Sequence, residues 1–407
     1  MRQPIRTLLF STLYPGSTRP GHGIFVETRL RELLASGAVD TRVVAPVPWF
    51  FSTNPRYGSY ARMAATPRYE VRNGVQVWHP RYFLPPKIGM NVAPFTLAAA
   101  ALPTIRRLQR EGFDFDLIDA HYYYPDGVAA ALLAARLGKP LVITARGTDL
   151  NLIPQYPIPR RLIQWTAGQA NASISVCQAL SNVLADLGAD PARLKVLRNG
   201  VDLVRFQPIP QAEARHALNL GDEPLLLSVG HLVERKGHHL VIGMLPHLPE
   251  HRLVIAGDGE ERDALTSLAR NLNVADRVHF AGAVPQSDLP RYYAAADCLV
   301  LASSREGWAN VLLESLACGT PVVATRLWGT PEVVASPVAG QLAGTRTVEG
   351  LLAAFQALQA DYPERAAVRR YAEGFSWDET TRGQIALFQS ILASHSNAPG
   401  ADLPDHA

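Results

Sequence analysis

The 407-residue chain has few of the residues that would stabilise it covalently or bind a metal. Its three cysteines, Cys177, Cys298 and Cys318, are too few for a disulfide framework and fit a reducing compartment. No spacing of cysteine and histidine matches a zinc motif, so we expect no metal site. The sequence also has neither a Walker loop nor the Gly-x-Ser-x-Gly turn, which argues against P-loop enzymes and against hydrolases built on that turn.

Long hydrophobic runs are lacking as well. The longest stretch of low polarity, 92–105, contains two prolines and falls short of the roughly 20 residues that a membrane-spanning helix needs. The short apolar run near residue 10 ends in Tyr14-Pro15-Gly16 rather than in a small-residue cleavage site. We therefore expect a first strand there, not a signal peptide. With 47% hydrophobic and 18% charged residues, the composition predicts a globular protein, and its length predicts two or three domains.

Positive charge is concentrated in the first half of the chain. Residues 1–200 hold 23 lysines and arginines against 12 acidic residues, whereas residues 201–407 hold 16 against 24. Such a split indicates two domains with different partners. The basic half could face an anionic acceptor or an anionic membrane surface, and a solvated basic face without function is an equal alternative. Arg106, Arg107, Arg110, Arg160 and Arg161 are candidates for peripheral membrane contact.

Short apolar strands alternate with helical patterns, which predicts parallel sheets built from βαβ units. In the first half we expect strands at 5–11, 41–45, 117–120 and 141–144, with helices at 26–36 and 127–137. In the second half we expect strands at 225–229, 252–256, 278–280, 298–302 and 322–325, with helices at 260–272 and 288–295. Residues 46–94 lack periodicity and predict an irregular excursion, and 206–223 predict a linker. The fold class is therefore α/β, with two successive domains and a cleft between them.

The segment 305–323 is the most informative for chemistry. A strand ends in a polar turn, Asn310 is a candidate N-cap, and Val311 and the apolar residues after it begin a short helix. This places a helix N-terminus at the carboxyl edge of a parallel sheet, where backbone N–H groups bind anions. Glu306 and Glu314 flank that N-terminus, so each can accept hydrogen bonds from hydroxyls on one side of a bound phosphate.

Two other loops suit phosphate binding. After the strand at 225–229, Gly230 permits close backbone approach, and Arg235 with Lys236 would stabilise the charge that builds up on a leaving diphosphate. The loop 14–25 follows the first strand and contains Gly21 and Gly23, but it is not the dinucleotide Gly-x-Gly-x-x-Gly pattern.

Further candidates lie at the ends of strands in the first half. His121 follows the strand at 117–120 and can reach the expected cleft, and Arg146 and Asp149 follow the next strand. Gly257 and Gly259 form a weak pattern that would approach a nucleotide base.

These motifs resemble the retaining glycosyltransferases of family 4, which have the GT-B fold of two facing Rossmann-like domains. The resemblance rests on the Glu-x7-Glu spacing of Glu306 and Glu314 and on the segment 229–237. Asn199-Gly200-Val201-Asp202 and Phe375-Ser376-Trp377 support it. It implies an amino-terminal acceptor domain, 1–200, a donor domain, 201–376, and a closing helix at about 377–392 that packs back on the first domain. We expect a disordered tail over 395–407.

The resemblance also implies roles for single residues. Arg235 and Lys236 would grip the donor diphosphate, Glu306 would contact the transferred sugar, and Glu314 would hold the ribose. Gly21 and Gly23 would lie near the diphosphate, and His121 beside the reacting sugar. No metal or other cofactor is implied, because cationic side chains replace the metal. The turn that would bind the donor comprises Gly307, Trp308, Ala309, Asn310 and Val311. Many members have Phe-Gly where this chain has Trp308-Ala309, a difference that would reshape the sugar pocket.

The expected function is transfer of a hexosyl or N-acetylhexosaminyl group from a nucleotide-diphosphate sugar to a glycan or lipid-linked acceptor, with retention of anomeric configuration, in polysaccharide or glycoconjugate biosynthesis. A nucleotide-sugar 2-epimerase of the same fold and a noncatalytic nucleotide-sugar-binding subunit are the alternatives. We expect a cytoplasmic protein, at the inner face of the membrane if the basic half contacts anionic lipid, and no nucleic-acid partner.

Overall fold

The computed structural model describes residues 3–396 and divides the chain into two compact units. Unit 1 comprises the residues up to Leu197 together with those from Glu379 onward, and unit 2 comprises Arg198–Asp378. The chain therefore passes between the units twice. The tail predicted to be disordered, 395–407, lies outside the described residues from 397 on, and His395 and Ser396 are the last residues of helix α16.

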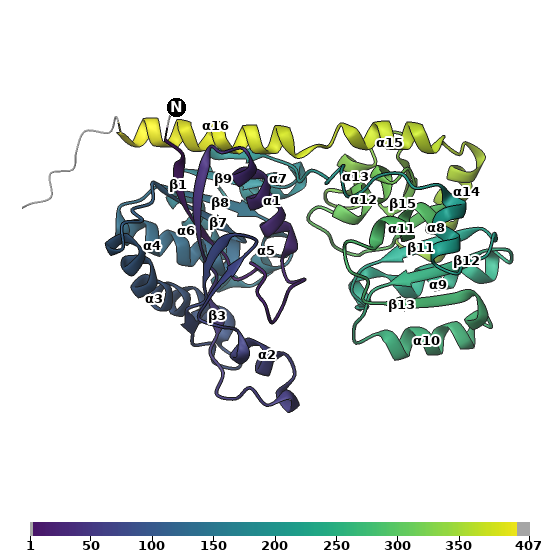
Figure 1. Ribbon diagram of the computed structural model, residues 1–407, viewed down its shortest axis with the longest axis horizontal. Coiled ribbons are helices and arrows are strands. Elements are labelled where there is room, and N and C mark those ends of the chain that lie inside the picture. The colour runs from purple at the N-terminus through teal and green to yellow at the C-terminus, as the bar shows by residue number, and fades with distance from the viewer. Residues whose placement is uncertain (1–2, 397–407) are drawn as a thin grey trace, which may run out of the picture. The chain divides into compact units, whose positions relative to one another are not determined.

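Unit 1 is built around an eight-stranded sheet in the order β10-β9-β8-β7-β1-β2-β5-β4 (Figure 1). Its neighbouring strands are parallel except for β4 and β5. The central strands are buried on both faces, as in parallel sheets covered by helices. The strands are β1 (Ile5–Phe10), β2 (Val39–Val44), β4 (Tyr69–Arg72), β5 (Val75–Trp78), β7 (Leu117–His121), β8 (Leu141–Ala145), β9 (Ala172–Ser175) and β10 (Leu194–Val196).

Helices connect these strands, and a separate pair of short parallel strands, β3 (Val47–Pro48) and β6 (Arg81–Tyr82), lies outside the sheet. The helices are α1 (Ile24–Ala35), η1 (Pro55–Tyr57), α2 (Ser59–Ala65), α3 (Gly89–Arg110), the π-turn η2 (Tyr123–Gly127), α4 (Val128–Leu137), α5 (Thr148–Asn151), η3 (Ile153–Gln155), α6 (Pro157–Gln169), α7 (Gln178–Asp186) and η4 (Pro191–Arg193). Helix α16 (Trp377–Ser396) returns to unit 1, where Phe388 and Ile391 pack against residues of β7, β8 and β9.

Unit 2 contains a six-stranded parallel sheet in the order β13-β12-β11-β14-β15-β16. Its strands are β11 (Leu225–Val229), β12 (Arg252–Ala256), β13 (Val278–Gly282), β14 (Cys298–Leu301), β15 (Val322–Thr325) and β16 (Gly340–Ala343). Its helices are α8 (Gln211–Ala217), η5 (Glu234–Lys236), α9 (His238–Met244), η6 (Leu245–His247), α10 (Arg262–Asn271), η7 (Ala275–Arg277), α11 (Leu289–Ala295), α12 (Asn310–Ala317), α13 (Thr330–Val333), α14 (Val348–Ala360) and α15 (Arg365–Glu373).

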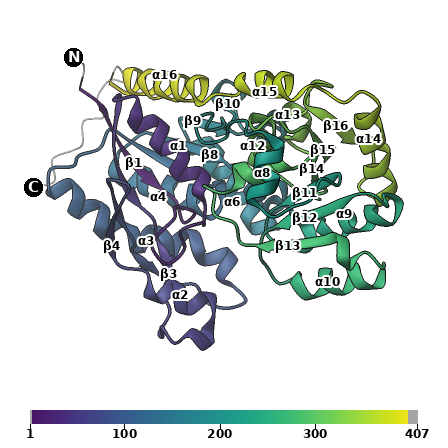
Figure 2. The same cartoon turned by 45° about the vertical axis from the view of Figure 1, so that its right-hand side comes forward.

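The expected irregular excursion at 46–94 is wrong in detail. That stretch holds β3, η1, α2, β4, β5 and β6 and the first turns of α3, and β4 and β5 extend the main sheet as an antiparallel pair. The elements are two to seven residues long, too short for either hydrophobic period to emerge from the sequence. Both views show α2 at the end of unit 1 that lies opposite α16 (Figures 1 and 2).

Helix α3 shows how packing overrides local propensity. Pro94 and Pro103 lie inside it, although proline removes a backbone donor and disfavours helix interiors. Burial of one face, which includes Leu97, Ala101 and Ile105, compensates for the lost hydrogen bonds. None of the helices within residues 3–396 is long and apolar enough to cross a membrane.

The linker expected at 206–223 is also wrong. Phe206 is buried, and α8 packs against α11 inside unit 2. Arg215 of α8 donates through Nε to the carbonyl of Ala295 at 3.0 Å and through Nη2 to Asp297 Oδ2 at 2.9 Å. This segment therefore belongs to the core of unit 2, and the chain crosses between the units at Leu197 and Arg198 instead.

Candidate functional site

The loops that follow β11 and β14 lie side by side, because these strands are neighbours in the sheet of unit 2. Gly237 has a φ of +73°, and a Cβ atom there would stand 2.0 Å from the carbonyl oxygen of Ala302. The N–H of Ser304 donates to the carbonyl of Arg235 at 2.7 Å. The turn η5, with Arg235 and Lys236, is thus held against the end of β14.

Lys236 and Glu306 meet where these two loops join. Lys236 Nζ lies 2.5 Å from Glu306 Oε1, and the Ser303 hydroxyl donates to the same oxygen at 2.7 Å. Only 14% of the lysine side chain and 10% of the glutamate side chain are exposed. The stem of Lys236 passes over Gly230, 3.5 Å from where a Cβ atom would stand. The structure therefore brings three predicted site residues together at the carboxyl edge of the sheet.

Glu314 lies in the second turn of α12 and is 8% exposed. It accepts a hydrogen bond from the Tyr293 hydroxyl to Oε2 at 2.7 Å. Burial raises the pKa of Glu314, while hydrogen bonds from Tyr293 and Gln286 oppose the shift. Arg205 in turn donates to Gln286 Oε1 at 2.6 Å. The carboxylate is therefore held by tyrosine and glutamine side chains that no sequence motif identifies.

The start of α12 differs from the prediction. Asn310 is the first residue of the helix and not its N-cap, a position held by Ala309 with no side-chain hydrogen bond. The Asn310 side chain is engaged elsewhere, since its Oδ1 accepts from Asn199 Nδ2 at 3.3 Å. Gly307 and Ala309 are buried and Val311 is half-buried.

Trp308 occupies the interior of unit 2. It is 6% exposed, and its ring centroid lies 6.5 Å from that of Phe375. Among the described residues its buried indole Nε1 has no hydrogen-bond partner. The ring therefore packs inside unit 2, behind the turn 307–311. Comparing Trp308-Ala309 with the Phe-Gly of many family members does not reveal this packing.

Gly257 and Gly259 have a packing explanation. A Cβ atom on Gly257 would stand 1.8 Å from the carbonyl oxygen of Gly230, and one on Gly259 would stand 2.4 Å from that of Leu232. The N–H of Leu232 also donates to the carbonyl of Asp258 at 3.0 Å. The glycines let the loop after β12 support the loop that carries Lys236.

In unit 1, His121 ends β7 and is 1% exposed. Arg146 hydrogen-bonds Nδ1, and Nε2 lies 3.3 Å from Asp119 Oδ2. Because a guanidinium group only donates, Nδ1 accepts and Nε2 carries the proton towards Asp119. Burial lowers the pKa of His121 to about 4, so the ring is neutral at physiological pH.

Helix α16 supports this histidine through a buried side-chain relay that sequence reasoning missed. Gln384 donates through Nε2 to Asp119 Oδ2 at 3.0 Å and accepts from Arg29 Nε at 2.6 Å. Gln384 is fully buried, and Arg29 is 1% exposed. A glutamine so far along the chain from Asp119 carries no local sequence signal.

Asp149 organises the loop that carries Arg146. Its carboxylate accepts the backbone N–H groups of Tyr123 at 2.7 Å, Gly147 at 2.6 Å and Arg146 at 3.1 Å. Asp149 is fully buried, and burial raises its pKa. The structure thus places Asp149, a predicted binding residue, where its carboxylate holds the backbone of this loop in position.

The glycine loop after β1 has one tight and one open position. Gly23 has a φ of +64°, and a Cβ atom there would stand 1.6 Å from the carbonyl oxygen of Leu13. Gly21 has open space where a side chain would begin, with no atom of the described residues within 4 Å. Glu70 accepts the N–H of Ser17 at 3.1 Å and contacts His79 Nε2 at 2.8 Å, so this carboxylate anchors the loop.

No group of three or more histidine, cysteine or acidic residues within 3–396 is arranged to hold a metal ion.

Comparisons with known proteins agree on one family. Residues 21–205 match the family described as Glycosyltransferase Family 4, and residues 210–375 match Glycosyl transferases group 1. A Bacillus subtilis protein named as a teichuronic acid biosynthesis glycosyltransferase is 31% identical over 334 residues, 80% of this chain and 82% of that protein. A D-inositol 3-phosphate glycosyltransferase of Segniliparus rotundus is 30% identical over 333 residues, 75% and 73% of the two chains. A sucrose-phosphate synthase from Thermosynechococcus elongatus aligns with a TM-score of 0.75 at 21% identity, over 97% of this chain and all of that one.

Gly257→Ala is expected to separate the loops after β11 and β12, because its methyl group would overlap the Gly230 carbonyl. Overpacking of this kind typically costs about 1–3 kcal/mol of unfolding free energy, measurable by denaturant titration. Gly344→Ala is the matched control, with no atom of the described residues within 4 Å of its Cβ position. Equal stability of the two variants would contradict the contact.

Gln384→Leu removes one partner of Arg29 and one of Asp119, both buried. We expect a loss of about 3 kcal/mol, since buried charged groups left without partners cost more than neutral ones. Hydrogen exchange of β7 and α16 measures it. Gln389→Leu makes the same change at an exposed position of α16 and should be neutral. Unchanged protection in Gln384→Leu would show that the relay does not stabilise β7.

Proposed function

The chain belongs to the family 4 glycosyltransferases with the GT-B fold, and we propose that it transfers a sugar from a nucleotide-diphosphate donor bound by unit 2 to an acceptor bound by unit 1. The contact between Lys236 and Glu306 carries this proposal. It joins a cation suited to a diphosphate and a carboxylate suited to sugar hydroxyls at one edge of a parallel sheet, where ligands of α/β proteins bind.

Lys236 can serve both groups, because an ammonium group has three donors. One donor holds Glu306, which leaves others for a phosphate oxygen. Arg235 is partly exposed beside it, and adjacent cations stabilise the negative charge that develops on a departing diphosphate. In this proposal the backbone of 307–311 and the start of α12 bind the phosphates, Glu306 contacts the transferred sugar, and Glu314 holds the ribose.

The reaction breaks the bond between C1 of the sugar and the diphosphate oxygen, whose electron pair leaves with the diphosphate. The acceptor oxygen forms the new bond to C1 on the same face, and its proton passes to the leaving phosphate oxygen, so the anomeric configuration is retained. Fixed cations do the work that a metal ion would do elsewhere. No carboxylate of the site is proposed as a covalent nucleophile.

The acceptor is proposed to be a glycan or a lipid-linked precursor that carries negative charge. The positive balance of the first half of the chain supports this choice, and so do the names of the two relatives, which specify teichuronic acid and an inositol phosphate. Gly21, Gly23, His121 and Arg146 are the residues of unit 1 proposed to bind or position it. A hexosyl or N-acetylhexosaminyl donor remains the proposed sugar class.

The deciding experiment is a panel of nucleotide sugars incubated with and without acceptors, with products identified by mass spectrometry. Acceptor-dependent release of nucleoside diphosphate supports transfer. A new nucleotide sugar formed without acceptor would identify a 2-epimerase instead. Donor binding with no turnover across the panel would favour a noncatalytic subunit.

Lys236→Ala is expected to lower turnover by about 10²–10³, the usual effect of removing one contact to developing charge. Lys236→Ala also leaves Glu306 without its ion-pair partner. The double variant Lys236→Met with Glu306→Gln removes both charges, so it should recover the stability of the protein but not its turnover. Arg291→Ala, at an exposed arginine of the same unit, is the control. Turnover like that of the unaltered enzyme in Lys236→Ala would refute the leaving-group role.

Tyr293→Phe tests the role of Glu314 through pH. An ionised Glu314 would accept ribose hydroxyls, so affinity for a nucleoside diphosphate should fall as pH drops through the raised pKa of Glu314. Removing the tyrosine hydroxyl should move that fall to higher pH. Calorimetric titration from pH 5 to 8 measures it, with Tyr292→Phe as control and pyrophosphate as the ligand without ribose. The same shift for pyrophosphate would contradict the ribose assignment.

A further inference from the structure

The exposed hydrophobic side chains of the protein are concentrated in one segment of unit 1. Of the 15 large hydrophobic side chains that are exposed among the described residues, ten lie between residues 49 and 95. They are Trp49, Phe51, Tyr60, Tyr69, Val71, Phe83, Leu84, Ile88, Met90 and Phe95. Scattered single residues of this kind are ordinary on a protein surface, whereas a concentration of them marks an interaction surface.

Contacts bring several of these residues close to one another. The N–H of Trp49 donates to the carbonyl of Tyr82 at 2.7 Å, so Trp49 and Phe83 follow the paired strands β3 and β6. The Phe50 ring contacts those of Phe51, Tyr57 and Tyr60, with centroids 4.5 to 5.3 Å apart. We call Trp49, Phe51, Tyr60, Phe83 and Ile88 the aromatic tip.

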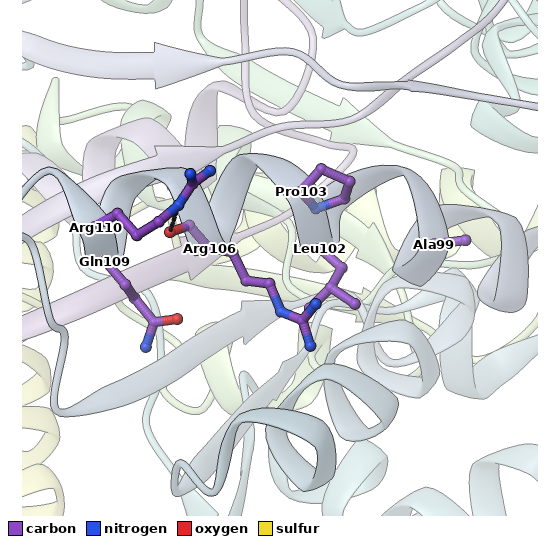
Figure 3. Close-up of a pocket in the computed structure, with 6 residues that line it drawn as sticks. All are labelled: Ala99, Leu102, Pro103, Arg106, Gln109 and Arg110. Carbon is purple, nitrogen blue, oxygen red and sulfur yellow. Dashed lines mark hydrogen bonds between the residues drawn. The ribbon is translucent and has the colours of Figure 1, made fainter.

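Helix α3 continues from this surface. A Cβ atom on Gly89 would stand 2.9 Å from Leu84 Cδ1, so the loop after β6 packs on the first turn of α3. Figure 3 shows Leu102 and Arg106 extending from the same side of that helix, in a shallow pocket that Arg110 also lines. The exposed residues of α3 change from apolar at its start to basic at its end.

The charge of the segment is almost entirely positive. Residues 46–110 contain nine lysines and arginines and one acidic residue, Glu70. Glu70 is engaged by His79 and by the backbone N–H of Ser17. Arg56, Arg62 and Lys87 are exposed among the apolar residues, and the Arg56 guanidinium lies 4.7 Å from the centre of the Tyr57 ring.

We propose that the aromatic tip docks onto an anionic phospholipid bilayer. Tryptophan and tyrosine favour the headgroup region, and the apolar residues around them partition towards the acyl chains. Arginine and lysine on long stems reach the anionic headgroups. Leu84, Ile88 and Met90 favour lipid over a glycan or a single-stranded nucleic acid, because aliphatic side chains offer no flat face on which a sugar or a base stacks.

This inference deepens the proposed function, since an enzyme held at a bilayer meets lipid-linked acceptors there, but its test does not depend on catalysis. The full chain is floated with vesicles of neutral phosphatidylcholine, or of phosphatidylcholine with 30% phosphatidylglycerol. Transfer to a soluble acceptor, or donor hydrolysis, is measured in parallel. Failure of vesicle binding with intact turnover overturns only the docking surface, whereas vesicle binding without turnover overturns only the proposed function.

The tip variant carries Phe51→Ser, Phe83→Ser and Ile88→Ser, all at exposed positions. We expect it to lose binding to anionic vesicles by about tenfold or more, because insertion scales with buried apolar area, and to keep its turnover on soluble substrates. The matched control removes three exposed hydrophobic side chains in and beside α6, through Tyr156→Ser, Ile158→Ser and Trp165→Ser. A larger loss in the control would place the membrane contact near Arg160 and Arg161 and overturn the proposal.

The charge variant carries Arg56→Gln, Arg62→Gln and Lys87→Gln. We expect about a hundredfold weaker binding to anionic vesicles, from about 1 kcal/mol for each charge near the surface, and a smaller dependence on salt. Equal binding of the unaltered protein to neutral and anionic vesicles would contradict the charge argument. Binding to a soluble acidic polysaccharide that the tip variant abolishes, without vesicle binding, would make the tip an acceptor platform and overturn the proposal.

Discussion

The ion pair between Lys236 and Glu306 is the contact on which the candidate donor site depends. Placing two charges where little solvent reaches them is costly unless further hydrogen bonds support them, and the hydroxyl of Ser303 supplies one to Glu306. The pair links loops that follow the neighbouring parallel strands β11 and β14. Gly237, where these two loops meet, and Gly257, in the supporting loop after β12, leave no room for a Cβ atom. The glycines therefore permit the close packing of the loops that carry the two charges.

Unit 1 solves a different problem, which is how to keep a histidine neutral inside a polar interior. Asp119 and Arg146 lie on opposite sides of the His121 ring, so their charges oppose each other in their effect on its proton affinity, and burial decides the direction. The relay from Arg29 through Gln384 then fixes Asp119. A residue of the last helix thereby positions the carboxylate that faces the protonated Nε2 of His121.

Residues whose signal is local could be identified from the sequence, and those whose signal is tertiary could not. Runs of apolar residues predict the strands, and Glu306, Glu314 and Lys236 follow those strands at short distances along the chain. Because the strands are parallel, their carboxyl ends lie at one edge of the sheet, and the three residues are expected there. Gln384, Tyr293 and Gln286 act through contacts between distant segments and carry no such offset. Asn310 shows the opposite limit. It is a good capping residue, but it stands one position after the N-cap, and its side chain accepts a hydrogen bond from Asn199 instead. The linker predicted at 206–223 is wrong for the same reason, because Phe206 is buried in unit 2.

The charge split between the halves of the chain takes on a sharper meaning in the structure. Residues 1–200 have a balance of 23 − 12 = +11, and 46–110 alone have 9 − 1 = +8, which leaves only 14 − 11 = +3 for the other residues of that half. The excess is therefore not spread over a solvated basic face. It belongs to the same segment that exposes the aromatic rings. A surface that combines positive charge with exposed apolar side chains binds favourably at the anionic, apolar boundary of a bilayer, whereas a uniformly basic surface would bind only soluble anions.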